Sequence, residues 1–147
     1  MNALYQKILQ DAGIRPSIQR IAVYAFLYEN RIHPDVETVY NKLYPIYPTL
    51  SKTTVYNTLK LFEEKHIVQS IKIEDDKLRF DAEMKNHIHF KCIRCGEIYD
   101  IFLDDKTSKE LDNISTSLPS GFSMDKLQTN VWGVCQKCSS NWFINFP

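Results

Sequence analysis

The sequence lacks three features that would each point to a class of protein. Its formal net charge is zero, so the overall basic balance that often marks a nucleic-acid-binding protein is missing. If the protein binds DNA, its positive charge must be clustered on one face. No apolar run approaches the roughly 20 residues that a membrane span requires. The first residues, MNALYQKILQDAG, carry charges in a helical pattern, so we expect no signal peptide and a cytoplasmic protein.

Cysteine is absent from the first half of the chain, and all four cysteines form two Cys-x-x-Cys pairs in the second half. Cytosolic thiols are normally reduced, so such pairs indicate metal or redox sites rather than structural disulfides. Two pairs supply the four thiolates of a tetrahedral Zn²⁺ site, and a closed site of this kind is structural, not catalytic. Redox-active pairs or free thiols are the alternative. The predicted structural zinc ligands are Cys92, Cys95, Cys135 and Cys138.

The first half of the chain is predicted to be helical, because apolar residues recur there at helical spacing. With 44% hydrophobic and 24% charged residues, the composition is that of a folded rather than a disordered protein. We expect four helices that begin near residues 3, 17, 35 and 51, with Asp35 and Ser51 as N-caps. His66 is expected to cap the end of the fourth. Strands over 67–73 and 78–81 complete a winged-helix arrangement, whose third or fourth helix enters the major groove.

The remainder of the chain predicts a smaller unit of mixed structure. Its expected elements are strands over 87–91 and 97–103, a helix over 106–116 and a strand over 122–134. The predicted fold class is therefore α+β. Its parts are a winged-helix domain over 1–82, a hinge over 83–86 and a small α+β domain over 87–147. A domain of about 60 residues has a thin core, so a zinc ion joining its two ends would stabilise it.

Histidines and aspartates supply a second set of candidate metal ligands. His87 and His89 lie two apart on a predicted strand, so both side chains project from the same face. Asp81 precedes them, Asp100 lies on the neighbouring predicted strand, and His33 belongs to the first domain. Three imidazoles and two carboxylates suit Fe²⁺, Mn²⁺ or Zn²⁺. Spacing in the sequence does not show that these side chains converge. A histidine before proline, such as His33, is more often a loop or capping residue than a metal ligand.

Seven stretches of the chain together resemble one family of proteins. They are GIRPSIQR (13–20), HPDVETVY (33–40), SKTTVYNTLKLFEE (51–64), RFD (79–81), HIHFKC (87–92), CGEIYDI (95–101) and WGVCQKC (132–138). On these motifs, and over nearly its whole length, the sequence resembles the ferric uptake regulator family. It is most similar to the peroxide-responsive branch, because it has aspartate at 81 and 100, where iron-uptake members usually have glutamate. Asn57 also favours that branch, since many iron-uptake members have arginine there.

The resemblance implies a homodimeric, metal-dependent repressor with an N-terminal winged-helix DNA-binding domain and a C-terminal dimerisation domain. It implies a structural Zn²⁺ at the four cysteines and a regulatory Fe²⁺ or Mn²⁺. Peroxide would act through metal-catalysed oxidation of a ligand histidine, His33 or His87. A regulator of iron, zinc or manganese uptake, sensing metal availability, is the alternative within the family. The regulatory ligands implied are His33, Asp81, His87, His89 and Asp100.

The DNA partner implied by this reading is an AT-rich inverted repeat. Tyr56 could contact a thymine methyl group and Asn57 an adenine edge. Arg20 and the lysines would meet phosphates, and Arg15 could enter a minor groove. A solvated helix face is the simpler reading of any single lysine. The candidate DNA-contacting residues are Arg15, Arg20, Ser51, Lys52, Thr53, Thr54, Tyr56, Asn57 and Lys60.

Two other classes of protein remain as alternatives. A metallohydrolase or oxidoreductase could use His87, His89 and Asp100, but no general base or nucleophile is evident beside them, and the winged-helix half would lack a purpose. A zinc-stapled interaction module without DNA binding is the other. We therefore expect a protein that is not an enzyme.

Overall fold

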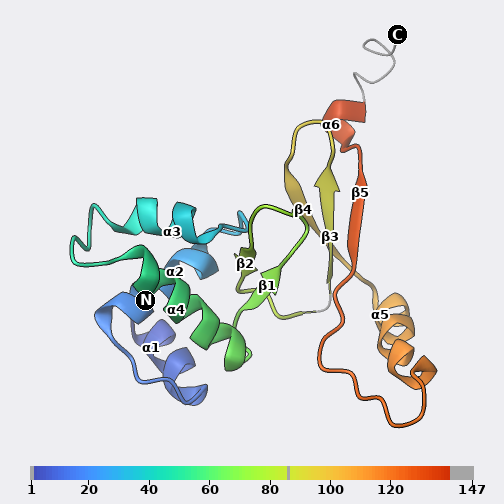
Figure 1. Cartoon of the computed structure of the whole chain (residues 1–147), viewed down its shortest axis with the longest axis horizontal. Helices are drawn as coiled ribbons and strands as arrows, with labels where there is room; N and C mark the ends of the chain where they lie inside the picture. The colour runs from blue at the N-terminus through green and yellow to red at the C-terminus, as the bar shows by residue number, and fades with distance from the viewer. Residues whose placement is uncertain (1, 86, 140–147) are drawn as a thin grey trace. The chain divides into compact units, whose positions relative to one another are not determined.

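The computed structural model describes residues 2–85 and 87–139, and the chain forms two compact units, Met1–Met84 and Lys85–Pro147 (Figure 1). Asn86, in the predicted hinge, and the last eight positions of the predicted second domain, 140–147, lie outside the described residues. Within the described part of the chain, the search for a helix long and apolar enough to cross a membrane finds none.

The first unit consists of four helices and a two-stranded sheet, as the sequence predicts. Side-chain oxygens of Ser17, Asp35 and Ser51 accept hydrogen bonds from backbone N–H groups three residues further on, and so cap the second, third and fourth helices. The helices are α1 (Asn2–Asp11), α2 (Ile18–Glu29), α3 (Val36–Leu43) and α4 (Lys52–Glu64).

Two of these helices end in a residue with a left-handed backbone. Gly13 has φ +77°, and the N–H of Ile14 donates to the carbonyl of Leu9 at 2.9 Å. His66 has φ 61°, and the N–H of Ile67 donates to the carbonyl of Phe62 at 3.1 Å. This six-to-one hydrogen bond satisfies a carbonyl that the helix end leaves without an intrahelical donor. His66 therefore caps α4, as predicted.

Apolar side chains from all four helices and the wing form one buried core. Val23, Val39, Val55, Leu59 and Phe62 are fully buried in it. The wing consists of β1 (Gln69–Ile71) and β2 (Arg79–Asp81), which pair antiparallel with Gln69 opposite Asp81 and Ile71 opposite Arg79. Both strands are shorter than predicted.

The second unit has a three-stranded sheet with β3 in the centre, between β4 and β5 (Figure 1). β3 runs antiparallel to β4 and parallel to β5. The elements of the unit are β3 (His87–Cys92), β4 (Ile98–Phe102), α5 (Asp105–Asp112), η1 (Asn113–Ser117), β5 (Asn130–Gly133) and α6 (Gln136–Ser139).

The predicted strand over 122–134 is wrong for most of its length. Only Asn130–Gly133 is a strand, and it pairs with β3 from His89 to Cys92. Since β3 begins at His87, only two residues before this register, it offers no partner to the chain further back. Residues 122–129 instead form an irregular segment, with Phe122 68% exposed.

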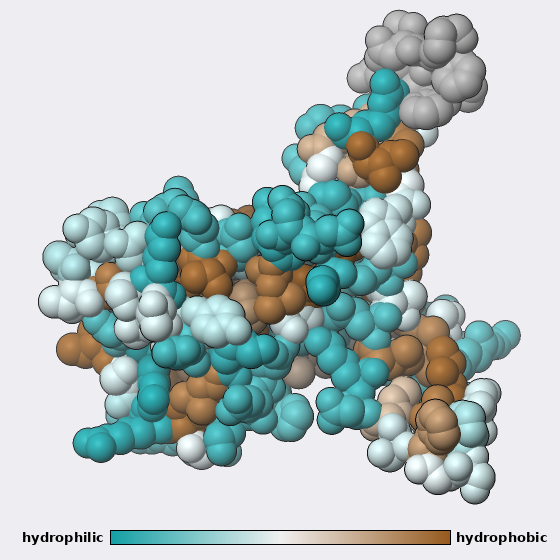
Figure 2. All heavy atoms as spheres, in the orientation of Figure 1, coloured by the Kyte–Doolittle hydropathy of each residue, from teal (hydrophilic) through white to brown (hydrophobic). Residues whose placement is uncertain are grey.

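The sheet of the second unit has one polar and one apolar face. Paired residues share a face, so the register places His87 with Phe102 and His89 with Asp100 on the same side. The alternate positions place Ile88 and Phe90 with Ile101 and Tyr99 on the other side. Few large apolar side chains of this unit are buried, and apolar atoms reach the surface near α5 and the loop after it (Figure 2).

Candidate metal centres and DNA-binding surface

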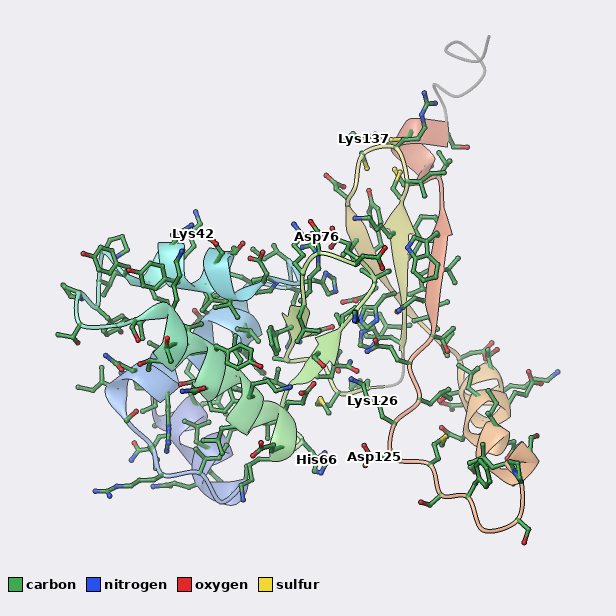
Figure 3. The ribbon with its side chains drawn as sticks, in the orientation of Figure 1. Lys42, His66, Asp76, Asp125, Lys126 and Lys137 are labelled. Carbon is green, nitrogen blue, oxygen red and sulfur yellow. The ribbon has the colours of Figure 1, made fainter. Side chains whose placement is uncertain are left out.

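The four cysteines come together at one end of the second unit. Cys92 ends β3, Cys95 lies in the turn after it, Cys135 directly precedes α6 and Cys138 lies within α6. Their sulfur atoms all lie within 4.8 Å of one another, with Cys95 Sγ 3.8 Å from Cys135 Sγ. A tetrahedron with Zn–S bonds of about 2.3 Å has sulfur atoms about 3.8 Å apart. Figure 3 shows the sulfur atoms at the end of the unit where Lys137 is labelled.

Backbone N–H groups prepare this cluster to bind a cation. The N–H of Cys95 and that of Cys135 point at Cys92 Sγ, at 3.5 and 3.4 Å. These donors lower the pKa of the Cys92 thiol to about 5. Burial raises the pKa of the Cys138 thiol, so this sulfur keeps its proton when no metal is bound. A divalent cation would bind all four sulfur atoms as thiolates and displace the protons that remain on them.

A group of nitrogen and oxygen donors lies on the polar face of the same sheet. Nε2 of His87 lies 3.0 Å from Nε2 of His89, and Oδ1 of Asp100 lies 3.3 and 3.6 Å from these two nitrogens. Neighbouring donors in an octahedral site with bonds of about 2.1 Å lie about 3 Å apart. Nδ1 of His87 is 2.7 Å from the carbonyl of Lys85 and donates to it, which leaves Nε2 to act as the ligand.

The first unit holds a histidine and a carboxylate of its own. Nε2 of His33 lies 3.7 Å from Oδ2 of Asp81, and both residues are buried. His33 has φ 54°, a left-handed conformation that costs energy for a residue with a side chain. The wing holds it there, because Arg79 Nη1 donates to the His33 carbonyl at 3.0 Å and the Phe80 N–H donates to the Pro34 carbonyl at 2.9 Å.

The candidate regulatory ligands thus form two groups, one in each unit, and each group has donors that fit a first-row divalent metal. Sequence reasoning missed the residues that support them. Arg79 holds the His33 loop, and Arg31 lies beside the Asp81 carboxylate. No motif or spacing marks these arginines, because their roles arise from contacts between segments about 50 residues apart.

The exposed side of α4 carries most of the predicted DNA contacts. Ser51, Lys52, Thr53, Tyr56 and Asn57 are exposed, while Val55 and Leu59 face the core. A hollow of about 370 Å³ joins this side to the start of α2. Its lining includes the predicted contact residues Arg20, Thr54 and Asn57, and Ser17, which caps α2. The sequence did not single out the other lining residues, Gln19, Thr58 and Leu61.

Several of the candidate basic residues already have partners in the protein. Lys52 Nζ lies 3.0 Å from Glu37 and above the Tyr40 ring. Lys60 Nζ lies 2.9 Å from Glu63. Arg20 Nη1 donates to the Arg15 carbonyl at 2.9 Å, which ties the two predicted arginines together. Any phosphate contact by these lysines must therefore compete with a carboxylate.

Comparison with known proteins gives consistent results for sequence and structure. The peroxide-responsive repressor PerR of Staphylococcus aureus strain Mu50 is 32% identical over 130 residues, covering 88% of this chain and 86% of that protein. The Campylobacter jejuni peroxide stress regulator matches with a TM-score of 0.68 and 26% identity, over 92% of this chain and 97% of that one. The Pseudomonas aeruginosa ferric uptake regulator with manganese matches with a TM-score of 0.70 and 22% identity, over 89% and 97%.

These likenesses confirm the predicted α+β class, a winged-helix unit followed by a smaller α+β unit. The sequence profile of the "Ferric uptake regulator family" matches residues 11–130, most of the chain. The chain belongs to the ferric uptake regulator family.

Proposed function

We propose that this protein is a homodimeric repressor that senses peroxide through a regulatory Fe²⁺ joining its two units. Its family is one of metal-dependent transcriptional regulators, which bind DNA as dimers and are not enzymes. The observation that carries the proposal is the pair of donor groups, His33 with Asp81 in the first unit and His87 with His89 and Asp100 in the second. Such a repressor would act in the cytoplasm.

The four cysteines would hold a structural Zn²⁺. Two arguments support zinc over a redox pair: the sulfur atoms have the spacing of a tetrahedral site, and backbone donors favour the thiolate form of Cys92. All four positions of the metal would be filled by protein sulfur. The ion would therefore stabilise the second unit, and any reaction with peroxide would take place at the regulatory metal.

The regulatory site would convert metal binding into DNA affinity. One ion gripped by ligands of both units selects one arrangement of the units from a hinged ensemble. In a homodimer that arrangement sets the separation of the two α4 helices, and only some separations fit successive major grooves. A two-fold dimer reads an inverted repeat, so we propose an AT-rich operator of that symmetry.

Peroxide would act by removing one of the ligands. If Fe²⁺ is held there, it would supply the redox chemistry by which hydrogen peroxide gives one oxygen atom to an imidazole of His33 or His87 and is itself reduced to water. An oxidised imidazole would no longer bind the metal, so the two units would lose their proposed link and the protein would leave the DNA. The His33 side chain is well suited to this role, since it is the only imidazole that the first unit contributes among the proposed ligands.

On the DNA, Asn57 and Tyr56 would read base edges while Lys52, Lys60, Arg15 and Arg20 meet the backbone. Ser51, Thr53 and Thr54 at the start of α4 would contact phosphates near the helix N-terminus. The exposure of this side of α4 and its continuity with Arg20 support the assignment. Asn57→Ala should weaken binding by about 1–3 kcal/mol and relax base preference at one position.

The decisive experiment compares protein loaded with Fe²⁺ and with Mn²⁺. Both forms should bind an AT-rich inverted repeat, and peroxide should release only the iron form. Mass spectrometry should then find the mass of one added oxygen atom on the peptide containing His33 or His87. The matched control is His66→Ala, which removes a histidine at the end of α4 and should change neither result.

Other outcomes would assign the protein differently. DNA binding that follows metal occupancy but ignores peroxide would make it an uptake regulator of iron, zinc or manganese. Metal-independent DNA binding, or none on any inverted repeat, would refute the repressor mechanism proposed here.

A further inference from the structure

The two oxygens of the Asp81 carboxylate face different partners within the first unit. Oδ1 lies 3.6 Å from Arg31 Nη1 and accepts a hydrogen bond from the Glu83 N–H at 2.9 Å. Oδ2 lies 3.7 Å from His33 Nε2. One oxygen is therefore held by a cation and a backbone donor, and the other is directed at an imidazole that we propose as a metal ligand.

Arg31 is itself fixed by several contacts. Its Nε donates to the carbonyl of Tyr28 at 3.1 Å, and its guanidinium lies 5.1 Å from the centre of the Tyr28 ring. Nη1 also lies 3.9 Å from Oε2 of Glu83. The arginine side chain is 36% exposed, whereas the Asp81 side chain is 2% exposed. A planar guanidinium held in this way gives a buried carboxylate a defined orientation.

We propose that Arg31 is a positioning residue that makes Asp81 a single-oxygen metal ligand, with Oδ1 kept by Arg31 and Oδ2 given to the ion. The inference rests on the proposed function, because it takes His33 and Asp81 as ligands of one divalent metal. A carboxylate bound through both oxygens occupies one more coordination position. Arg31 would thus preserve the open position at which peroxide must bind.

A double-mutant cycle tests whether Arg31 acts through Asp81. Mn²⁺ affinity is measured by electron paramagnetic resonance on the full-length zinc-containing protein and on Arg31→Met, Asp81→Asn and the double variant. Removal of a group that orients a ligand typically changes affinity about 10–100-fold, so we expect Arg31→Met to weaken binding at least about tenfold. In the Asp81→Asn background Arg31→Met should have little further effect.

The cycle separates orientation from simple charge effects. Loss of one positive charge near the ion acts in both backgrounds, so it cancels in the coupling. Lys7→Met, which removes one positive charge from the exposed side of α1, should leave Mn²⁺ affinity unchanged. Arg31→Lys should recover part of the affinity, and it replaces Arg31→Met if the latter does not fold. Independent, additive effects of Arg31→Met and Asp81→Asn would overturn the inference.

Infrared difference spectra with isotope-labelled aspartate give a readout that does not depend on affinity. The separation of the two carboxylate stretching bands should indicate single-oxygen binding in the parent and shift toward two-oxygen binding in Arg31→Met. An identical spectrum in both would contradict the proposal. His33→Ala distinguishes the two levels of inference: if it leaves Mn²⁺ affinity unchanged, His33 is not a ligand of the ion and the proposed function fails. If it weakens affinity while the cycle is additive, only the role of Arg31 is lost.

Discussion

The two units of this chain are stabilised by different means. In the first, helices and wing share a continuous apolar core that includes Val23, Leu59 and Phe62, all fully buried. In the second, the buried residues within the described part are Cys92, Cys135 and His89, while Phe102, Trp132 and other large apolar side chains are more than one-third exposed. The first unit therefore buries apolar surface on folding, whereas the second buries little, so on the proposed function it would rely on its metal and on a partner that covers its exposed apolar side chains.

Loss of the cysteine site should have the largest effect, and it should fall on the second unit alone. Structural zinc supplies about 10–16 kcal/mol of apparent binding free energy in small zinc domains, far more than the thin core of this unit can replace. Cys135→Ser should therefore abolish zinc binding and unfold the second unit, with the helices of the first retained.

Zinc content, circular dichroism and limited proteolysis measure this outcome. The control is Ser139→Ala, which changes a residue that is next to Cys138 but has no thiol. Protection of the second unit against protease without zinc would show that the cysteines are dispensable for folding.

A core substitution should produce the opposite pattern. Phe62 is fully buried and meets Tyr24 edge to face with ring centroids 5.8 Å apart. Phe62→Ala should cost the first unit about 3–5 kcal/mol in urea denaturation, with zinc content unchanged. Phe122→Ala in the second unit removes the same ring from a site that is 68% exposed, and a comparable cost there would contradict the contrast between the units.

The apolar face of the second unit's sheet should matter for dimerisation more than for folding. Ile101 is 40% exposed and lines a hollow of about 450 Å³ with Phe90 and Tyr99. If a second copy covers this face, Ile101→Glu should raise the dimer dissociation constant at least about tenfold, since it buries a charge at an apolar interface. Analytical ultracentrifugation measures the shift, with Lys109→Glu on exposed α5 as the control. An unchanged dimer would place the interface elsewhere.

The smallest differences should come from the aspartates that cap a helix in each unit. Burial opposes ionisation of Asp35, but hydrogen bonds from Thr38 outweigh it and lower the pKa of Asp35, and the N–H of Thr107 lowers the pKa of Asp104. Asp35→Ala should cost about 1 kcal/mol at neutral pH, and the more exposed Asp104→Ala should cost less.

The pH dependence of these caps follows from the direction of the shifts. A carboxyl whose pKa is lowered by folding contributes stability above its unfolded pKa and loses that contribution as pH falls through the folded value. The difference in urea midpoint between Asp35→Ala and the parent should therefore shrink in acid. If the difference in urea midpoint stays constant down to the lowest pH at which both proteins fold, the charged form of Asp35 contributes nothing to stability.

What the sequence could predict follows from how local each feature is. The start of α4 at Ser51 and its apolar stripe depend on neighbouring residues, and both are confirmed. The Cys-x-x-Cys spacing also identified the four thiols that converge. The strand over 122–134 was mispredicted because its length is set by β3, its distant partner. Arg31 was missed for the same reason, since its contact with Asp81 joins segments far apart in the chain.

The central strand β3 carries residues of both groups of candidate metal ligands in the second unit. Its last residue, Cys92, belongs to the thiol cluster, while His87 and His89 near its first belong to the imidazole pair. A shift of β3 by one position would turn both rings toward the apolar side. At Gly133 the backbone of β5 lies close to the Phe90 ring, and a Cβ there would come within 3.1 Å of that ring. If both groups hold metal as proposed, an oxidant that removes the thiols from their site would free one end of the strand that carries the two imidazoles, so damage at one site would reach the other.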